Sequence, residues 1–135
     1  MNIELTDKEF RRLLDLVYIG NWILNSTREK DRFEDYDILQ EKLFALCAKN
    51  GMNALISRWQ GHIFPSSAYE NGGIHEAIAD YEDAVFFDIL AEELARRDLG
   101  CLDSEPADYT ELNARMDEYM DEFEKSGVEN LVLEA

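Results

Sequence analysis

The first apolar stretch of the chain predicts a helix from about residue 7 to residue 25. Thr6 and Glu9 have the spacing of a capping box, in which two side chains satisfy free N–H groups at a helix start. Apolar side chains then follow almost all round the helix axis, which indicates burial on several sides. They are Phe10, Leu13, Leu14, Leu16, Val17, Tyr18, Ile19, Trp22, Ile23 and Leu24. We expect this to be the central helix of the fold.

A second helix is predicted over residues 33–47, where apolar side chains recur at helical spacing until Asn50-Gly51 offers a left-handed stop. Residues 52–60 suggest a short additional helix. The stretch 61–73 contains a proline and several glycines, so it is expected to be a long connection.

A third helix is predicted from about residue 74 to residue 99, and Gly100 ends it. One of its faces is apolar through Ile74, Ile78, Tyr81, Val85 and Ile89. The last helix is expected to start near residue 104 or 105 and to end at Ser126-Gly127. Its apolar residues form a narrow stripe of Tyr109, Leu112, Met116, Tyr119, Met120 and Phe123.

Both ends of the chain alternate like strands, because Ile3 and Leu5 at the start and Leu131 and Leu133 at the finish recur with a period of two. The predicted fold class is therefore all-α: a compact bundle of four main helices, with a minimal two-stranded β ribbon that pairs the N- and C-termini. The whole chain, 1–135, is expected to be a single helical domain.

Charge narrows the choice of partners. The net charge is -17, and residues 61–135 hold 20 of the 30 acids but only 4 of the 13 bases. Such a surface repels phosphate, so direct binding of nucleic acid or of a membrane is not expected. The longest apolar stretch is too short to span a bilayer and no targeting signal is visible, so we expect a cytoplasmic protein.

Recognisable catalytic chemistry is scarce in this sequence. The stretch 83–100 is rich in acids, but Glu92 and Arg96, like Glu93 and Arg97, have the i,i+4 spacing of ion pairs along a helix. Metal-binding and phosphate-binding motifs are missing, and two cysteines make no disulfide framework. We therefore expect no cofactor, no metal site and no catalytic residues, and the balance favours a protein that is not an enzyme.

Two features of the sequence are candidates for a partner-binding surface. An acidic row on the third helix has no Lys or Arg four residues on to neutralise it, and the loop before this helix carries aromatic side chains of the kind enriched at interface centres. The candidate residues are Trp59, His62, Phe64, Tyr69, Glu76, Asp80 and Asp83. A solvated acidic face and a lid over the core are the structural alternatives.

The preferred function is a non-enzymatic protein–protein interaction module that binds a basic protein partner or itself as a homodimer. The first alternative is an acidic nucleic-acid mimic, with Asp117, Asp121 and Glu124 adding to the acidic row. The second is a small enzyme that uses His62, Tyr69 and nearby carboxylates for acid–base chemistry.

Overall fold

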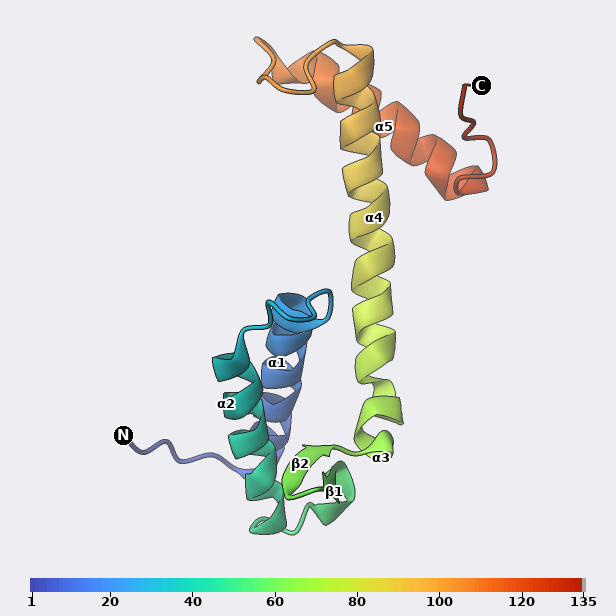
Figure 1. Cartoon of the computed structure of the whole chain (residues 1–135). Helices are drawn as coiled ribbons and strands as arrows, with labels where there is room; N and C mark the ends of the chain where they lie inside the picture. The colour runs from blue at the N-terminus through green and yellow to red at the C-terminus, as the bar shows by residue number, and fades with distance from the viewer. Residues whose placement is uncertain (135) are drawn as a thin grey trace. The chain divides into compact units, whose positions relative to one another are not determined.

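The computed structural model describes residues 1–134 and is mostly helical (Figure 1). The elements are α1 (Asp7–Asn25), α2 (Glu34–Ala45), the 3-10 turns η1 (Leu46–Ala48) and η2 (Asn53–Leu55), β1 (Ile56–Trp59), β2 (His62–Pro65), α3 (Ser67–Tyr69), the π-type turn η3 (Glu70–Ile74), α4 (His75–Asp98) and α5 (Tyr109–Ser126). Four main helices and a two-stranded antiparallel sheet agree with the predicted helical class.

The chain divides into two compact units, Met1–Ile78 and a second from Ala79 onward. Helix α4 starts in the first unit and continues into the second. A single domain over 1–135 stays a prediction, and each unit is described on its own below.

Helix α1 begins at the predicted capping box. The Thr6 hydroxyl accepts from the Glu9 N–H at 3.1 Å, and the Glu9 carboxylate accepts from the Thr6 N–H at 3.0 Å. One stripe of the helix is buried, consisting of Phe10, Leu14, Tyr18, Asn21 and Asn25. Leu16 and Ile23 are exposed, so the expectation of burial on several sides is wrong.

The core of the first unit joins α1 to α2, the hairpin and the start of α4. Leu14, Phe44 and Cys47 are fully buried, and the Phe44 and Tyr69 rings meet edge to face at 5.1 Å between centroids. Ile78, the last residue of the unit, belongs to the same cluster. In Figure 1, α1 and α2 lie side by side and the hairpin lies at one end of this pair.

The two strands form a hairpin inside the first unit, where the sequence suggested a short helix and a loop. Trp59 pairs with His62 across a two-residue turn, in which Gln60 and Gly61 both have positive φ, 49° and 80°. Positive φ at both turn residues matches the right-handed twist of the strands that the turn joins.

The predicted ribbon between the chain ends is wrong, because residues 3–5 and 131–133 lie outside strands. Ile3 and Leu133 are among the exposed hydrophobic residues. A two-residue turn closes a hairpin at little cost in chain entropy, whereas pairing the two ends would close a loop of more than a hundred residues.

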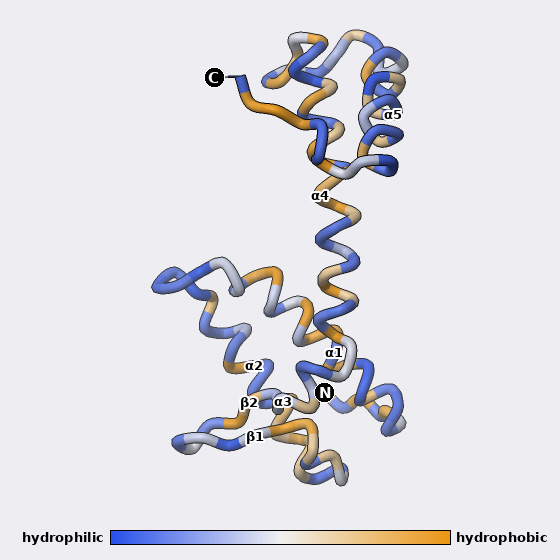
Figure 2. The backbone as a smooth tube through the Cα atoms, turned by 90° about the vertical axis from the view of Figure 1, so that its right-hand side faces the viewer, coloured by the Kyte–Doolittle hydropathy of each residue, from blue (hydrophilic) through white to orange (hydrophobic). Residues whose placement is uncertain are grey.

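The second unit contains most of α4 together with α5. Hydrophobic and hydrophilic residues alternate along both helices (Figure 2). Its buried residues are Ala91, Ala95, Cys101, Leu112 and Phe123. Helix α5 starts later than predicted, at Tyr109, because the Asp108 carboxylate caps it by accepting from the Thr110 N–H at 2.8 Å.

Candidate functional site

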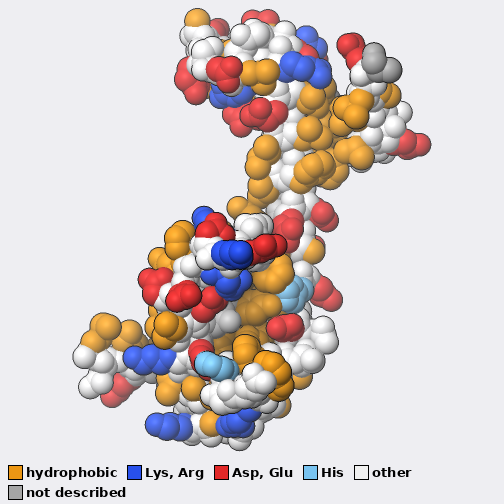
Figure 3. Space-filling model, viewed as in Figure 1, with side chains coloured by type: hydrophobic (Ala, Val, Ile, Leu, Met, Phe, Trp, Pro, Cys, Tyr) orange, Lys and Arg blue, Asp and Glu red, His pale blue; other side chains and the backbone are white. Residues whose placement is uncertain are grey.

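A groove of about 710 Å³ lies in the first unit between α1, α2 and β2. This volume is in the range of small-ligand sites. On the visible face of this unit, hydrophobic side chains reach the surface among acidic and basic ones (Figure 3). The groove is lined by Tyr18, Asn21, Trp22 and Ser26 of α1, by Arg32, by Glu34, Asp37, Ile38, Gln40 and Glu41 of α2, and by His62, Ile63, Phe64 and Pro65 of β2.

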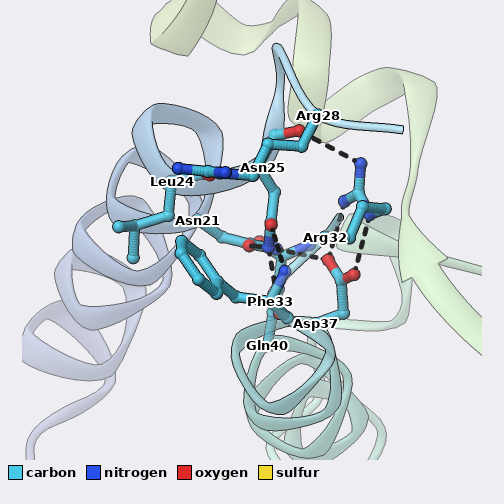
Figure 4. A network of polar contacts seen from close by, with 8 residues as sticks. All are labelled: Asn21, Leu24, Asn25, Arg28, Arg32, Phe33, Asp37 and Gln40. Atoms are coloured by element: carbon cyan, nitrogen blue, oxygen red, sulfur yellow. Dashed lines mark hydrogen bonds and ion pairs between the residues drawn. The ribbon is translucent and has the colours of Figure 1, made fainter. Parts of the chain in front are cut away.

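A buried polar network sets the angle between the α1 end and the α2 start (Figure 4). The Asn25 side chain accepts from the backbone N–H of Phe33 at 2.8 Å and donates to the backbone carbonyl of the same residue at 3.2 Å. It also donates to the Asn21 side chain at 2.6 Å. Because Asn25 is almost fully buried, these bonds hold the chain where α2 begins.

Asp37 links this network to the groove. Its carboxylate receives two hydrogen bonds from the Arg32 guanidinium, at 2.8 and 2.9 Å, and one from the Asn21 amide at 3.0 Å. The bonds from Arg32 are the main reason that the pKa of Asp37 lies below its usual value. Arg32 and Asp37 therefore face the groove as a bidentate ion pair.

Glu41 ties the hairpin to α2 along another side of the groove. Its carboxylate accepts from the Ile63 backbone N–H at 2.8 Å and lies 3.1 Å from Nδ1 of His62. The backbone hydrogen bond from Ile63, with a further contribution from His62, lowers the pKa of Glu41. This residue stays a carboxylate at neutral pH.

Aromatic side chains form the α1 side of the groove. The Tyr18 hydroxyl is hydrogen-bonded to Nε2 of His75 at 2.7 Å, and burial raises the pKa of Tyr18 to about 12. Trp22 packs edge to face on His75 with 4.9 Å between ring centroids. Trp22 is 36% exposed, so part of its ring is open to a ligand while the rest is held by the fold.

The candidate residues from the hairpin region occupy three different places. Trp59 is 66% exposed on β1, whereas His62 and Phe64 line the groove from β2. Tyr69 is 1% exposed and donates a hydrogen bond from its hydroxyl to Asp15 at 2.9 Å. It is a core residue, as the alternative of a lid over the core implied.

The acidic row Glu76, Asp80 and Asp83 lies along α4, and all three side chains are exposed. Among residues 1–134 none of the three forms a salt bridge. Of the two i,i+4 pairs predicted further along the helix, Glu92–Arg96 is present at 3.2 Å. Arg97 instead pairs with Asp98 at 2.9 Å, so the predicted pair with Glu93 is wrong.

The α1 and α2 sides of the groove are not evident from the sequence. Asn21 and Asn25 stand four residues apart inside an apolar stripe, and two buried amides at that spacing are the signal that could have revealed the network. Glu34, Asp37 and Glu41 share one face of α2, but that face is recognisable as a site only once the hairpin lies opposite.

The acid–base alternative combined His62 with Tyr69. In the structure the two side chains have different hydrogen-bond partners: His62 contacts Glu41, and Tyr69 contacts Asp15. Within residues 1–134 no three or more His, Cys, Asp or Glu side chains are grouped closely enough to hold a metal ion. Cys47 and Cys101 are both buried free thiols.

No helix in the described part of the chain combines the length and apolar character needed to cross a membrane. Compared with protein-family models, with curated proteins and with solved structures, the chain shows no significant match.

Replacing Asn25 by alanine should lower the free energy of unfolding by about 2–4 kcal/mol, because it removes three hydrogen bonds and leaves the Phe33 N–H without its side-chain partner. Urea unfolding measures this change. Asn50→Ala is the matched control, since the Asn50 side chain also donates to a helix carbonyl but is exposed. Equal losses in the two variants would contradict the structural role of Asn25.

The ion pair of Asp37 predicts how stability depends on pH. Its pKa is lower in the folded than in the unfolded chain, so the carboxylate contributes stability that is present above the unfolded value of about 3.9 and lost as the pH falls through the folded value. Asp37→Asn should therefore destabilise the protein more at pH 7 than at about pH 2. Urea unfolding of both variants at both pH values, with Asp35→Asn as the control, tests this, and a pH-independent difference would contradict it.

Proposed function

We propose that the chain is a non-enzymatic interaction module that binds a basic protein partner through the groove and hairpin of its first unit. The observation that carries this proposal is the groove itself, because it combines solvent-accessible aromatic rings with carboxylates held in place by the fold. Buried aromatic anchors surrounded by a polar rim are typical of interface centres.

Phe64 and Trp59 are the anchors that the hairpin contributes. Phe64 is 44% exposed and lines the groove, and Trp59 projects from the neighbouring strand. Aromatic side chains bury a large area at a low cost in side-chain entropy, so they can supply most of the retained binding energy. The carboxylates of the rim contribute mainly to the choice of partner.

The acidic row on α4 has a different role in this proposal. Glu76, Asp80 and Asp83 are exposed and outside salt bridges in the described chain, so they add to a negative field that extends beyond direct contact. Such a field increases the association rate of a basic partner at low salt. A second copy of the chain is the alternative partner, but it brings the same charge of -17, so self-association would be weakened at low salt.

An acidic mimic of nucleic acid is the second candidate function, and α5 supports it. This helix carries six acids over 18 residues, or about 27 Å, which approaches the density of one phosphate per about 3.4 Å on a DNA strand. The helix has two basic residues: Arg115 is already paired with Asp98 and Glu118, and Lys125 lies in the last turn. Competition between duplex DNA and this protein for a captured DNA-binding protein would distinguish the mimic from a general interaction module.

We also propose that the four main helices pack into one compact bundle in solution. Each of them has an apolar stripe, and α1, α2 and α4 already contribute buried residues to one core. A compact chain of 135 residues has a radius of gyration of about 14 Å. Small-angle X-ray scattering should give a value near this one, and a radius above about 18 Å would contradict the bundle.

The partner surface is tested by capture of binding proteins from the native cell extract followed by kinetic measurement. Trp59→Ala combined with Phe64→Ala should weaken binding at least tenfold, because it removes both hairpin anchors. The triple change of Glu76, Asp80 and Asp83 to lysine should slow association several-fold at low salt and have little effect at high salt.

Unchanged affinity in the aromatic variant would refute the proposed surface, provided that its melting temperature matches that of the wild type. Unchanged association in the triple variant would show that the acidic row is only solvated.

A further inference from the structure

We propose that the groove binds an extended basic segment of the partner through two arginine side chains, one at Glu34 and one at Glu41. This inference rests on the proposed function and specifies the chemistry of its ligand. It follows from the charges inside the groove, from an arginine that the groove already holds, and from the spacing along α2.

The charges that line the groove are unbalanced. Three carboxylates face it from α2, and Arg32 is the one arginine or lysine among the lining residues. Arg32 is engaged by Asp37 in a bidentate pair, and Glu41 contacts the Ile63 N–H and the His62 ring, so neither Glu34 nor Glu41 is paired with an arginine or lysine of the described residues. Glu34 is exposed and has no ion pair among the described residues, so a cationic ligand meets no internal competitor there.

The Arg32–Asp37 pair shows how this surface accommodates a guanidinium group. Both bonds are shorter than 3 Å and involve both carboxylate oxygens of a residue on the same helix face as Glu34 and Glu41. Arginine is suited to such sites because its planar group offers parallel N–H donors to a carboxylate.

Aromatic rings complete the complementarity with arginine. Guanidinium groups stack on aromatic faces, and the first unit already uses this contact twice, with Arg28 over Phe33 at 4.4 Å and Arg11 over Tyr69 at 4.8 Å. Trp22 and Phe64 line the groove and are partly exposed, so their rings are available to the ligand.

The spacing of the two acids gives the spacing of the arginines. Glu34 and Glu41 are seven positions apart on α2, which corresponds to a rise of about 10 Å. A peptide in the extended polyproline II conformation has three residues per turn, so side chains i and i+3 lie on the same side and about 9 Å apart. A segment with the pattern Arg-x-x-Arg therefore places one guanidinium near each carboxylate.

Binding of a six-residue peptide, capped Gly-Arg-Ala-Ala-Arg-Gly, tests the inference. The full chain with Trp59→Phe retains Trp22 as its one tryptophan, so fluorescence then reports from inside the groove. The control peptide replaces both arginines by citrulline, which keeps the shape and removes the charge. At 0.15 M salt the arginine peptide should bind about tenfold more tightly than the citrulline peptide.

Variants of the chain separate the groove from the general negative charge. Glu34→Gln and Glu41→Gln should each weaken binding about two- to fivefold, and glutamine at 41 can still accept from the Ile63 N–H. Asp35→Asn removes a charge from the neighbouring position outside the groove lining and should leave the affinity unchanged.

Three results would each overturn the inference. They are equal affinity of the two peptides, a loss of binding in Asp35→Asn as large as in Glu34→Gln or Glu41→Gln, and calorimetric binding that leaves the Trp22 fluorescence unchanged. If the variant with Trp59→Ala and Phe64→Ala loses the native partner while the arginine and citrulline peptides bind the groove equally, the proposed function stands and this ligand assignment fails. If the double aromatic variant keeps the partner, the proposed function fails on its own evidence.

Discussion

The two hydrogen bonds between the Asn25 side chain and the backbone of Phe33 determine the geometry of the first unit. They connect the end of α1 to the start of α2 across a polar loop and so fix which face of α2 turns toward α1. The Glu41 bond to Ile63 then places β2 against the same face. A shift at Asn25 would therefore alter the groove on two of its sides, because the α1 and α2 walls both depend on this junction.

The helices were predictable because their signals are local. The box of Thr6 and Glu9 gave the start of α1, and α4 runs from His75 to Asp98 close to its expected limits. The hairpin escaped prediction because Gln60-Gly61 is a weaker turn signal than Asn-Gly, and the outward-facing Phe64 obscures the alternation of β2. The alternation at the chain ends led to a wrong prediction of strands, because a period of two over only three residues carries little information.

The candidate site was only half visible in the sequence. His62 and Phe64 stood out because they are ring-bearing residues two positions apart in a loop-like stretch, and both line the groove. Glu34 and Glu41 did not stand out, because they are two acids among thirty and their importance depends on tertiary contacts. Tyr69 was a candidate for the partner-binding surface, but its ring is buried in the core and its hydroxyl donates a hydrogen bond to Asp15.

The core of the first unit takes residues from both of its ends, Phe10 near the start and Ile74 and Ile78 at the finish. During synthesis on the ribosome this core cannot close until residue 78 has left the exit tunnel, which at about 5–20 residues per second means several seconds of exposure. Throughout that interval the apolar faces of α1 and α2 are available to chaperones. The second unit is synthesised afterwards, so its strongly acidic segment emerges from the ribosome when the first unit is ready to fold.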